Sequence, residues 1–533
     1  MKTIVALILS LILFTGCQYI LPAPATPEPT PLAPTPTPAP RVLTKQRGGT
    51  LNISMHIPKT NNPLLNEDIT ADKVFKLMFQ PLVALDERQK PVPFLAESFT
   101  FAEEGTSVDI VLKAGVLWWD GEPVTADDAA YSLNVLRTAP ETAVYKACFQ
   151  DVGTVSVIDE YTLRINYTRR VGYDPYRLCF PIIPRHYYSD RNTSPYIPMG
   201  NGPYKLETYS NIREMVLSRN DSYATPPFID SVRIITISGA ETEMLAFSHG
   251  IIDEMVTTMS EWGKYTGTKQ AEVTTYVNTT FDFIGFNFNN RALSDLQVRK
   301  AVAHAVNRRL IEDSVFLNHA APALTTISPA SWLYEPVTAS YPYNPETARA
   351  LLTNAGYELN AEGVMFKQDG GLALSFKILV NEENTERVKI AAILKENFAE
   401  AGIQCEITAL PFEEYEKRLK EKNFDLMVGG FRLAPAPDPS FAFHSSGINE
   451  GGNYFSYRSD IMDALLSSLP TISDEDNFIK AYSEYQKLFA GDLPCIGLVF
   501  RESAVLTDTR IYGEKRPAIN NEFYNIHEWF IWE

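Results

Sequence analysis

Arg432 is the side chain whose position best suits ligand chemistry. It follows an apolar run, residues 425–430, that is predicted to be a strand, and it opens a loop that contains Ala434 and Asp438. Ligands of open α/β sheets bind outside the carboxyl ends of strands, so this loop is the leading location for a binding site. The guanidinium of Arg432 is suited to bind a ligand carboxylate through two parallel hydrogen bonds, and a surface or interlobe salt bridge is the alternative.

Motifs of catalysis are absent from the sequence. It holds no G-x-S-x-G nucleophile elbow, no H-E-x-x-H helix and no Walker A loop. The seven histidines are scattered without the spacing of a metal site, at His56, His186, His249, His304, His319, His444 and His527. The sequence therefore predicts neither an enzyme nor a bound metal or cofactor.

The N-terminal segment has the layout of a signal peptide. Lys2 precedes an apolar run, residues 4–14, that is too short for an ordinary transmembrane helix. Cys17 follows Thr15 and Gly16, and this arrangement resembles the lipobox of bacterial lipoproteins, in which the cysteine thiol is diacylated. We therefore expect residues 1–16 to be a lipoprotein signal peptide. Cys17 is expected to carry the lipid anchor, whose acyl chains include palmitate. An ordinary secretion signal with a coincidental cysteine is the alternative.

The segment 17–46 is predicted to be a Pro/Thr-rich linker behind that anchor. Nine of the twenty residues from 21 to 40 are proline. Proline-rich chain is stiff and extended, so these twenty residues would span roughly 60 Å. The segment is therefore suited to hold a globular body away from the membrane, on the extracytoplasmic side or on the periplasmic face in a two-membrane bacterium.

The remaining four cysteines divide into two pairs. Cys148 and Cys179 are close enough in sequence to share a lobe, and outside the cytoplasm a disulfide between them is permitted but not required. Cys405 and Cys495 lie in apolar, strand-like runs, where a free cysteine packs as a small hydrophobic residue. None of these spacings is typical of a metal site.

Length and charge limit the class of protein. A chain of 533 residues exceeds one ordinary core, so two or three lobes are expected. Hydrophobic residues make up 45% and charged residues 21%, which fits a globular body. The net charge of −18 leaves no basic surface to displace counterions from phosphates, and this argues against a nucleic-acid partner.

The second half of the chain alternates strands and helices. Gly356 and Gly402 are typical helix stops, and strand–helix–strand alternation indicates an α/β lobe with a largely parallel sheet. A longer amphipathic helix is predicted over residues 295–316. In the first half, Thr125 is predicted to cap a helix that ends near Arg137. The predicted elements of the alternating region are strands 374–380, 404–410 and 425–430 and helices 345–355, 386–401 and 412–422.

Eight segments, in chain order, resemble the bacterial extracellular solute-binding protein family 5, the peptide- and nickel-binding class. Trp119 stands where the family pattern carries a histidine, so a role that needs an imidazole there is absent. The segments are GGTL at 48–51, PFLAESF at 93–99, LKAGVLWWDGEPVTADD at 112–128, NGPYKL at 201–206, LSRNDSY at 217–223, FNFN at 286–289 with VRKAV at 298–302, YNPETARALL at 343–352 with AGY at 355–357, and DPSF at 438–441.

This resemblance implies an α/β fold of the periplasmic-binding-protein type, class II, with two lobes joined by a hinge and an extra subdomain in lobe I. It implies a monomer that captures a peptide-like ligand by closure of the lobes and delivers it to the transmembrane subunits of an ABC permease. The expected divisions are lobe I at 47–80, 198–288 and 500–533, the subdomain at 81–197, and lobe II at 289–499.

The resemblance also implies which residues meet the ligand. Peptide binders of the family hold the ligand ammonium with an aspartate that aligns with Pro435, so Asp438 is the available substitute, with a turn-forming role before Pro439 as its alternative. Asn287 and Phe288 lie where the chain is expected to cross between lobes, where they line the cleft or build the hinge. The expected ligand-binding residues are Asn287, Phe288, Trp332, Arg432, Ala434, Asp438 and Phe441.

Two other ligand roles stay open within the family. One is the binding of nickel, haem or another small-molecule chelate, which the loss of the histidine at Trp119 disfavours. The other is a receptor that senses peptide without transport, since the binding step would be the same.

Overall fold

The computed structural model describes residues 44–189, 197–210, 214–258, 260–336, 340–367 and 372–532. The chain divides into two units, Met1–Thr44 and the compact unit Lys45–Glu533. The predicted signal peptide, the lipid-bearing Cys17 and the greater part of the predicted linker lie outside the described residues. The architecture below is that of the compact unit.

A four-stranded sheet forms the base of lobe I, in the order β1-β10-β9-β8, with β1 parallel to β10 and the other neighbours antiparallel. Helix α1 (Ile69–Met78) packs in the same core, because Phe75 is buried with Leu51 of the sheet. The helix begins at Asp68, whose carboxylate accepts a hydrogen bond from the backbone N–H of Thr70. The strands are β1 (Thr50–Met55), β8 (Tyr204–Ser210), β9 (Glu214–Arg219) and β10 (Ser231–Thr236).

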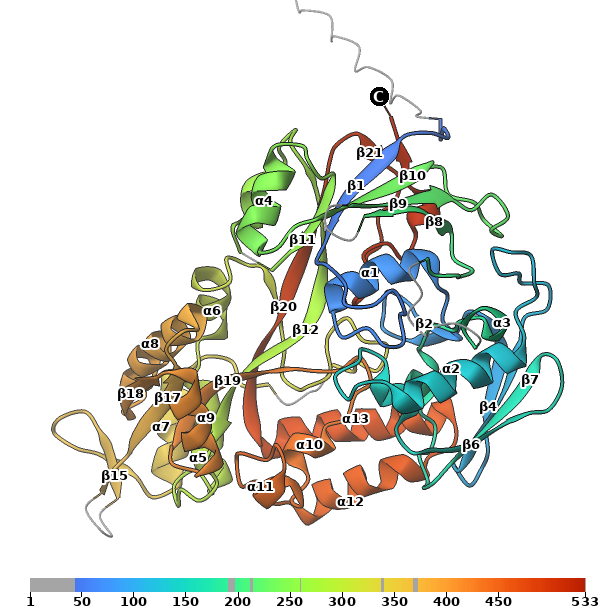
Figure 1. The fold of residues 1–533 in the computed structure, drawn as a ribbon. Helices are drawn as coiled ribbons and strands as arrows, with labels where there is room; N and C mark the ends of the chain where they lie inside the picture. The colour runs from blue at the N-terminus through green and yellow to red at the C-terminus, as the bar shows by residue number, and fades with distance from the viewer. Residues whose placement is uncertain are drawn as a thin grey trace, which may run out of the picture. The chain divides into compact units, whose positions relative to one another are not determined.

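A second, antiparallel sheet in the order β4-β5-β7-β6 lies beside lobe I and shares its hydrophobic core (Figure 1). Its helix α2 (Ala126–Thr138) begins at a capping box made by Thr125 and Asp128, where the sequence predicts the start. The other elements of this region are β2 (Val83–Leu85), β3 (Pro91–Pro93), β4 (Ala96–Phe101), β5 (Ser107–Leu112), β6 (Val152–Val157), β7 (Thr162–Tyr167) and α3 (Arg185–Tyr188).

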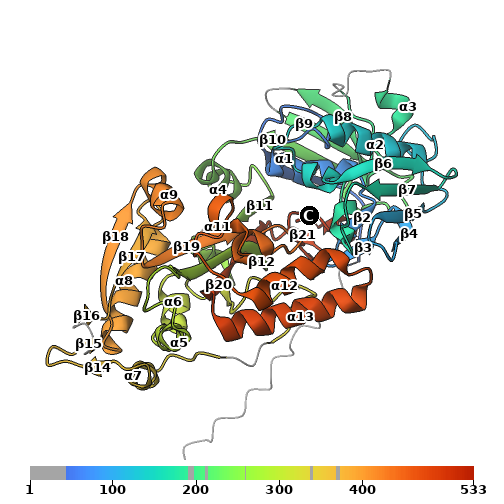
Figure 2. The same cartoon turned by 90° about the horizontal axis from the view of Figure 1, so that it is seen from below.

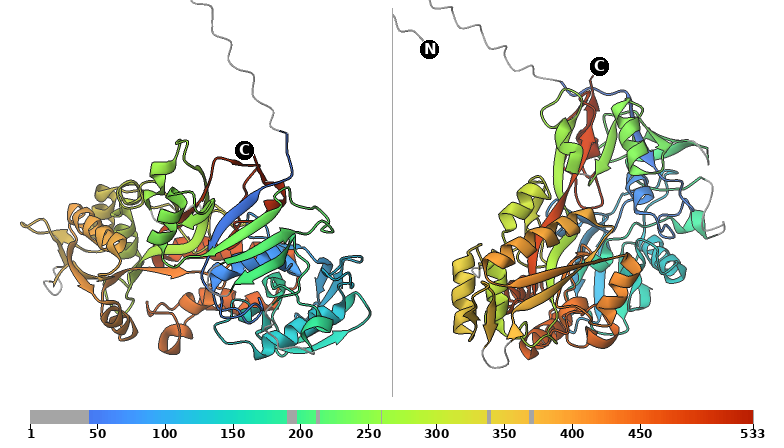
Figure 3. Two further views of the ribbon diagram at one scale, coloured as in Figure 1. Left: turned by 45° about the horizontal axis from the view of Figure 1, so that its top comes forward. Right: turned by 90° about the vertical axis from the view of Figure 1, so that its left-hand side faces the viewer.

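Two long antiparallel strands connect the lobes. β12 (Glu272–Phe286) and β20 (Cys495–Thr507) pair along nearly their whole length, with a register irregularity between Val277 and Phe281. At one end β20 also pairs with β11 (Glu254–Thr257), and at the other end β12 also pairs with β19 (Leu426–Arg432). Figures 1 and 3 show β20 running from the region of β1 and β11 down to lobe II. The chain therefore crosses between lobes on a two-strand hinge.

Lobe II contains the alternating strands and helices that the sequence predicts. β17 runs parallel to β18 and to β19, so this part of the sheet is parallel. The predicted helix 295–316 is two helices, because Asn307 caps a new helix by accepting from the N–H of Leu310. The elements are α5 (Leu296–His304), α6 (Arg308–Ser314), β13 (Ala320–Pro322), α7 (Pro345–Asn354), β14 (Glu358–Leu359), β15 (Met365–Lys367), β16 (Leu372–Ala373), β17 (Ser375–Asn381), α8 (Thr385–Glu400), β18 (Gln404–Leu410) and α9 (Phe412–Lys420).

A helical layer follows β19 and covers the other face of lobe II (Figure 2). It is held by an aromatic cluster in which Phe443, Phe455 and Phe489 are fully buried. After β20 the chain returns to lobe I, where Trp529 is fully buried in the lobe I core. The remaining elements are α10 (Ser440–Phe443), α11 (Gly447–Glu450), α12 (Asp460–Ser468), α13 (Glu475–Asp492), α4 (Ala240–Ser248), β21 (Ile511–Tyr512) and β22 (Phe530–Ile531).

Within the described ranges, no helix combines the length and the apolar character needed to cross a bilayer.

Candidate ligand-binding site

Three adjoining cavities lie where lobe I, the β4–β7 sheet region, the hinge strands and the loop after β19 meet. Their volumes are about 320 Å³ (cavity A), 340 Å³ (cavity B) and 310 Å³ (cavity C). Residues 434–436 line both A and B, Gln89 lines both B and C, and Ile519 lines both A and C. The three cavities therefore adjoin one another between the lobes, separated by the residues that they share.

Cavity B is built by the loop after β19 and contains four of the seven residues predicted from the sequence. These are Arg432, Ala434, Asp438 and Phe441. β19 ends at Arg432, so the loop leaves the carboxyl end of a strand, as the sequence argument requires. Phe441 packs its edge against Phe431, with ring centres 5.0 Å apart.

The two charges of cavity B form no salt bridge among the described residues. Asp438 acts at longer range on Arg169, whose pKa is raised first by Asp151 and further by Asp438. Arg432 and Asp438 are both exposed, and neither forms an ion pair with another side chain in the described part of the chain. One Asp438 oxygen accepts a hydrogen bond from the backbone N–H of Ser440 at 3.0 Å, so the turn-forming role that the sequence left open is also present. Cavity B is therefore lined by one cation and one anion, which can pair with a ligand that carries both charges.

Gln89 lines cavities B and C and was not among the residues predicted from the sequence. Its residue is 6% exposed, and its Nε2 has no hydrogen-bond partner. The backbone is held in the left-handed region, at φ 63°, by a bond from its own N–H to Asp86 and one from the Tyr176 hydroxyl to its carbonyl. A buried amide donor without a partner is costly, and a ligand acceptor would relieve that cost.

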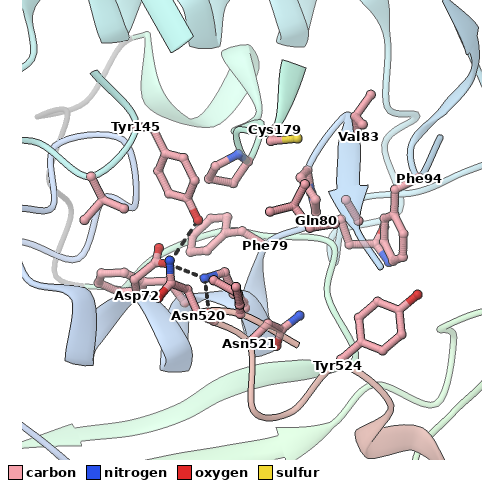
Figure 4. Close-up of a pocket in the computed structure, with 18 of the residues that line it drawn as sticks. Asp72, Phe79, Gln80, Val83, Phe94, Tyr145, Cys179, Asn520, Asn521 and Tyr524 are labelled. Carbon is pink, nitrogen blue, oxygen red and sulfur yellow. Dashed lines mark hydrogen bonds and ion pairs between the residues drawn. The ribbon is translucent and has the colours of Figure 1, made fainter. Parts of the chain in front are cut away.

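Cavity A is lined mainly by apolar side chains. In Figure 4, Phe79, Val83, Phe94 and Tyr524 surround the space, with Asp72 and Tyr145 on one side. The residues come from α1, from β2, from the segments 144–148 and 176–181, from the loop after β19 and from the C-terminal segment.

Asp72 is the buried acid of cavity A. It is 1% exposed, and its Oδ2 accepts hydrogen bonds from Lys76 and, at 3.1 Å, from the hydroxyl of Tyr145. Its Oδ1 has no hydrogen-bond partner. Lys76 also donates to the carbonyl of Asn520, which ties α1 to the C-terminal segment. The Oδ1 atom of Asp72 therefore remains available as a hydrogen-bond acceptor.

Cys148 and Cys179 also line cavity A, and both are free thiols. The bridge between them that the sequence left open is therefore not formed in the structure. Burial raises the pKa of Cys148 to about 12, with the carboxylate of Asp174 adding to it. Burial likewise raises the pKa of Cys179 well above its usual value. The two sulfurs face the backbone carbonyls of Tyr176 and Pro175, each at 3.8 Å, and the raised pKa values favour the protonated thiols.

The structure places the other three predicted residues outside cavities A and B. The indole N–H of Trp332 donates to the hydroxyl of Tyr176 at 2.9 Å, and the ring stacks on Phe478. Trp332 therefore joins lobe II to the β4–β7 region at the edge of the cleft.

Asn287 and Phe288 lie against the lobe II core at the end of the hinge strand β12, so of the two roles that the sequence left open the structure places them nearer the hinge than the cleft. The Asn287 amide donates to the carbonyls of Lys422 at 2.9 Å and Phe424 at 2.7 Å, while Phe288 packs under the guanidinium of Arg299. The reason is the length of β12, which continues to Phe286 before the chain turns. Their role in this structure is to fix the end of that strand.

A contact between the lobes closes the cleft at α13. Lys90 forms an ion pair with Glu475, and the hydroxyl of Tyr173 donates to the same carboxylate at 2.9 Å. Partial burial acts to raise the pKa of Glu475, but these two hydrogen bonds outweigh it and hold the pKa below its usual value. Beside them Gly172, at φ 70°, lies so close that an added Cβ would be 2.6 Å from the carbonyl oxygen of Ile472.

A buried charge pair lies in lobe I next to Asp72. Lys73 is 3.9 Å from Glu254, and both oxygens of Glu254 lack hydrogen-bond partners. Burial raises the pKa of Glu254 to about 7, against the lowering effect of Lys73. Within the residues that the structure describes, no group of three or more His, Cys, Asp or Glu side chains is placed to hold a metal ion.

Comparison with known proteins gives the family. A sequence model described as "Bacterial extracellular solute-binding proteins, family 5 Middle" matches residues 90–453, more than half of the chain. The chain is 25% identical to the oligopeptide-binding protein AppA of Bacillus subtilis over 503 residues, which cover 91% of this chain and 92% of AppA. It is 24% identical to the glutathione-binding protein GsiB of Salmonella choleraesuis over 465 residues, with 83% and 86% covered.

Solved structures agree on the fold. The unliganded open form of the periplasmic murein tripeptide-binding protein MppA superposes with a TM-score of 0.80 at 18% identity, covering 92% of this chain and 98% of MppA. Bacillus subtilis AppA in complex with a nonapeptide gives a TM-score of 0.61 at 24% identity, covering 92% and 100%. The two-lobed periplasmic-binding fold predicted from the sequence is confirmed. Members of this family are substrate-binding proteins of ABC transporters and not enzymes, and the chain belongs to the bacterial extracellular solute-binding proteins, family 5.

Proposed function

We propose that this chain captures a peptide in the cleft between its lobes and presents it to the membrane-spanning subunits of an ABC importer. The observation that carries the proposal is the pair Arg432 and Asp438, two opposite charges that form no salt bridge among the described residues, on one loop of one cavity. A free peptide is a zwitterion with the complementary charges at its two ends. Names of relatives that include oligopeptide-, glutathione- and dipeptide-binding proteins support this ligand class.

The loop around these charges is preorganised. Pro435, Pro437 and Pro439 alternate with other residues, and each proline fixes its own φ angle. The carbonyl of Pro437 also accepts a hydrogen bond from the hydroxyl of Tyr482, at 2.5 Å, which ties the loop to α13. A loop that is already ordered loses little conformational entropy on binding, so more of the contact energy appears as affinity.

Ligand binding is coupled to the hinge in this proposal. Asn278 and Thr279 line cavity B and lie within the register irregularity of β12. A β-bulge disrupts the ladder and lets a strand bend locally. A ligand that contacts both this segment and the loop after β19 therefore favours the closed arrangement of the lobes by its differential affinity.

The proposal includes how the chain is held at the membrane. Residues 1–16 act as the signal peptide, Cys17 carries the lipid and the segment 17–46 is the tether, with the Thr15-Gly16-Cys17 sequence as its support. The folded body acts as a monomer, with lobe I at 47–80, 198–288 and 500–533, its subdomain at 81–197, and lobe II at 289–499. The crossing strands β12 and β20 support the division into two lobes, while the boundary within β12 lies before Ile284, since Ile284 and Phe286 are buried in the lobe II core.

Calorimetry with blocked peptides tests the proposed roles of the two charges. The purified full chain is titrated with a tripeptide pool in free, N-acetylated and C-amidated forms, after native mass spectrometry has identified any co-purified ligand. We expect amidation to weaken binding to the wild-type chain and to matter little in Arg432→Gln. Acetylation should weaken binding to the wild-type chain and matter little in Asp438→Asn, which keeps a side-chain acceptor for Ser440. Lys389→Gln, on the exposed face of α8, is the matched charge control.

The outcomes separate the alternatives. Equal binding of blocked and free peptides would refute the charge-pair argument. A co-purified metal complex or haem, together with no affinity for peptides, would overturn the proposed ligand class and favour chelate binding.

A further inference from the structure

We infer that cavity A takes an uncharged, aromatic-sized group of the ligand that carries a hydrogen-bond donor, as a tyrosine side chain does. The inference rests on the proposed function, because it assigns a side-chain preference to the peptide held in cavity B. It adds a specificity-determining residue, Asp72, that no part of the sequence argument singled out.

The size of cavity A limits what it can hold. Its volume of about 320 Å³ is at the lower end of the range for ligand pockets, which is roughly 300–1,000 Å³. Cavity A therefore fits one bulky side chain rather than a whole oligopeptide. Residues 434–436 separate it from cavity B and line both, so a peptide backbone in B can send one side chain into A.

The walls of cavity A select an apolar body. Phe75, Phe79, Val83, Phe94 and Tyr524 line it, and an aromatic ring buries a large apolar area against such walls. The edge of Phe75 faces Phe79, with ring centres 6.3 Å apart. Aromatic pairs of this geometry leave further ring edges and faces available to a ligand ring.

Asp72 adds one polar requirement to this apolar space. Its Oδ2 is already held by Lys76 and Tyr145, while its Oδ1 lacks a partner. The two carboxylate oxygens turn as one unit, so a ligand donor must reach Oδ1 while Oδ2 keeps its bonds to Lys76 and Tyr145. A ligand O–H or N–H would pair an acceptor that is otherwise buried and unsatisfied.

The existing ion pair argues for a neutral donor over a ligand ammonium group. Asp72 and Lys76 already compensate each other's charge, and Lys76 lines the same cavity. A second cation would enter an apolar space beside that lysine without a counter-charge, and burying an unpaired charge is costly. A phenol supplies the donor without the charge.

Peptides that differ by one hydroxyl group test the inference on the full, unmutated chain. Three series of alanine tripeptides carry tyrosine, phenylalanine or O-methyltyrosine at the first, second or third position, and calorimetry gives each dissociation constant. At one position we expect tyrosine to bind about ten-fold more tightly than phenylalanine, the effect of one hydrogen bond to a charged acceptor. O-Methyltyrosine, which keeps the oxygen but cannot donate, should lose that advantage.

Variants then assign the preference to Asp72. In the double variant Asp72→Leu with Lys76→Met, which removes the whole ion pair, tyrosine and phenylalanine peptides should bind equally. Tyr145→Phe is the matched control, because it removes a hydroxyl from the same wall and leaves the free oxygen of Asp72, so the tyrosine preference should persist.

The results distinguish failure of the inference from failure of the proposed function. Peptide binding without a tyrosine preference at any position in the wild-type chain would overturn the inference and leave the proposed function intact. A tyrosine preference that survives in the double variant would also overturn it. Failure of all the tripeptides to bind would refute the peptide ligand itself.

Discussion

Replacement of Gln89 by leucine should weaken ligand binding without destabilising the protein. Gln89 lies between cavities B and C with its Nε2 buried and unpaired. Leucine has a similar size and no polar atoms, and it retains the same main-chain hydrogen bonds to Asp86 and Tyr176. The substitution therefore removes the unsatisfied donor together with the amide oxygen and keeps the backbone contacts.

The magnitude follows from the cost of that donor. A buried donor without a partner costs about 1–3 kcal/mol, and a ligand carbonyl that accepts from it recovers this amount on binding. Because about 1.4 kcal/mol corresponds to a ten-fold change in an equilibrium constant, Gln89→Leu should raise the dissociation constant of a peptide by roughly 5- to 150-fold. The free energy of unfolding of the ligand-free variant should be unchanged or higher, by at most about 1–3 kcal/mol.

Calorimetry with a bound peptide and urea unfolding without ligand measure the two quantities. Gln80→Leu is the matched control, since Gln80 is as deeply buried but its Nε2 donates to the hydroxyl of Tyr223 at 2.6 Å. That variant leaves the Tyr223 hydroxyl unpaired and should lower the free energy of unfolding. The reasoning would be refuted if Gln89→Leu were as destabilising as Gln80→Leu, or if it left the peptide affinity unchanged.

Two further predictions concern pH. The pKa of Glu475 is lowered by Lys90 and Tyr173 against the effect of partial burial, so its contribution to the interlobe contact is present above its ordinary pKa of 4.5 and is lost as the pH falls through the lowered value. Small-angle scattering of the ligand-free chain should show a larger expansion at acid pH for the wild type than for Glu475→Gln, and equal expansion would contradict this. The pKa of Glu254 is raised by burial from 4.5 to about 7, so protonated Glu254 favours the folded state below 4.5 and this contribution is lost as the pH rises through 7. The free energy of unfolding in urea should therefore fall across that window in the wild type, and a parallel fall in Glu254→Gln would exclude Glu254 as the source.

The family motifs predicted the fold, and the structure gives a physical reason for one of them. In the segment 201–206, Gly202 lies against the end of α1, and a Cβ there would be 2.5 Å from the carbonyl oxygen of Leu77. Its N–H donates to the carbonyl of Met78 at 2.8 Å. Only glycine permits this approach of a strand to a helix end, and the approach is visible only after folding. The family motif therefore identified Gly202, but it did not show the close contact with α1 that requires glycine there.

The candidate site was predictable where one local rule located it. The loop after β19 follows from a strand and its carboxyl end, and it supplied Arg432, Ala434, Asp438 and Phe441, which all line cavity B. Whether Asn287 and Phe288 line the cleft or build the hinge stayed open, because the sequence does not show how far β12 extends. One or two residues more or fewer in β12 would decide whether the side chains that follow it lie in the cleft or in the core.

Asp72 and Gln89 could not be found from the sequence, because what distinguishes them is the lack of a partner. Whether a buried polar atom is satisfied depends on segments that are distant in the chain, such as Asn520 beside Lys76 and Tyr176 beside Gln89. Their residue types alone do not mark them as binding residues. Asp72 is one acid among many in an acidic chain, and Gln89 is one glutamine in a turn.

Buried polar groups that have hydrogen-bond partners and those that lack them also differ in their roles. The former stabilise the ligand-free protein, and the latter are available to a ligand. Asp282, on the hinge strand β12, is fully buried and accepts hydrogen bonds from Arg387 at 2.9 Å and from Arg501 at 2.6 Å. A group bonded in this way stabilises the ligand-free chain and has little left to offer a ligand. Asp72 and Gln89 differ from Asp282, since each lines a cavity and holds a buried acceptor or donor that no protein group uses. The chemistry expected of the ligand is the complement of these groups: a carbonyl for Gln89, a neutral donor for Asp72, and opposite charges for Arg432 and Asp438.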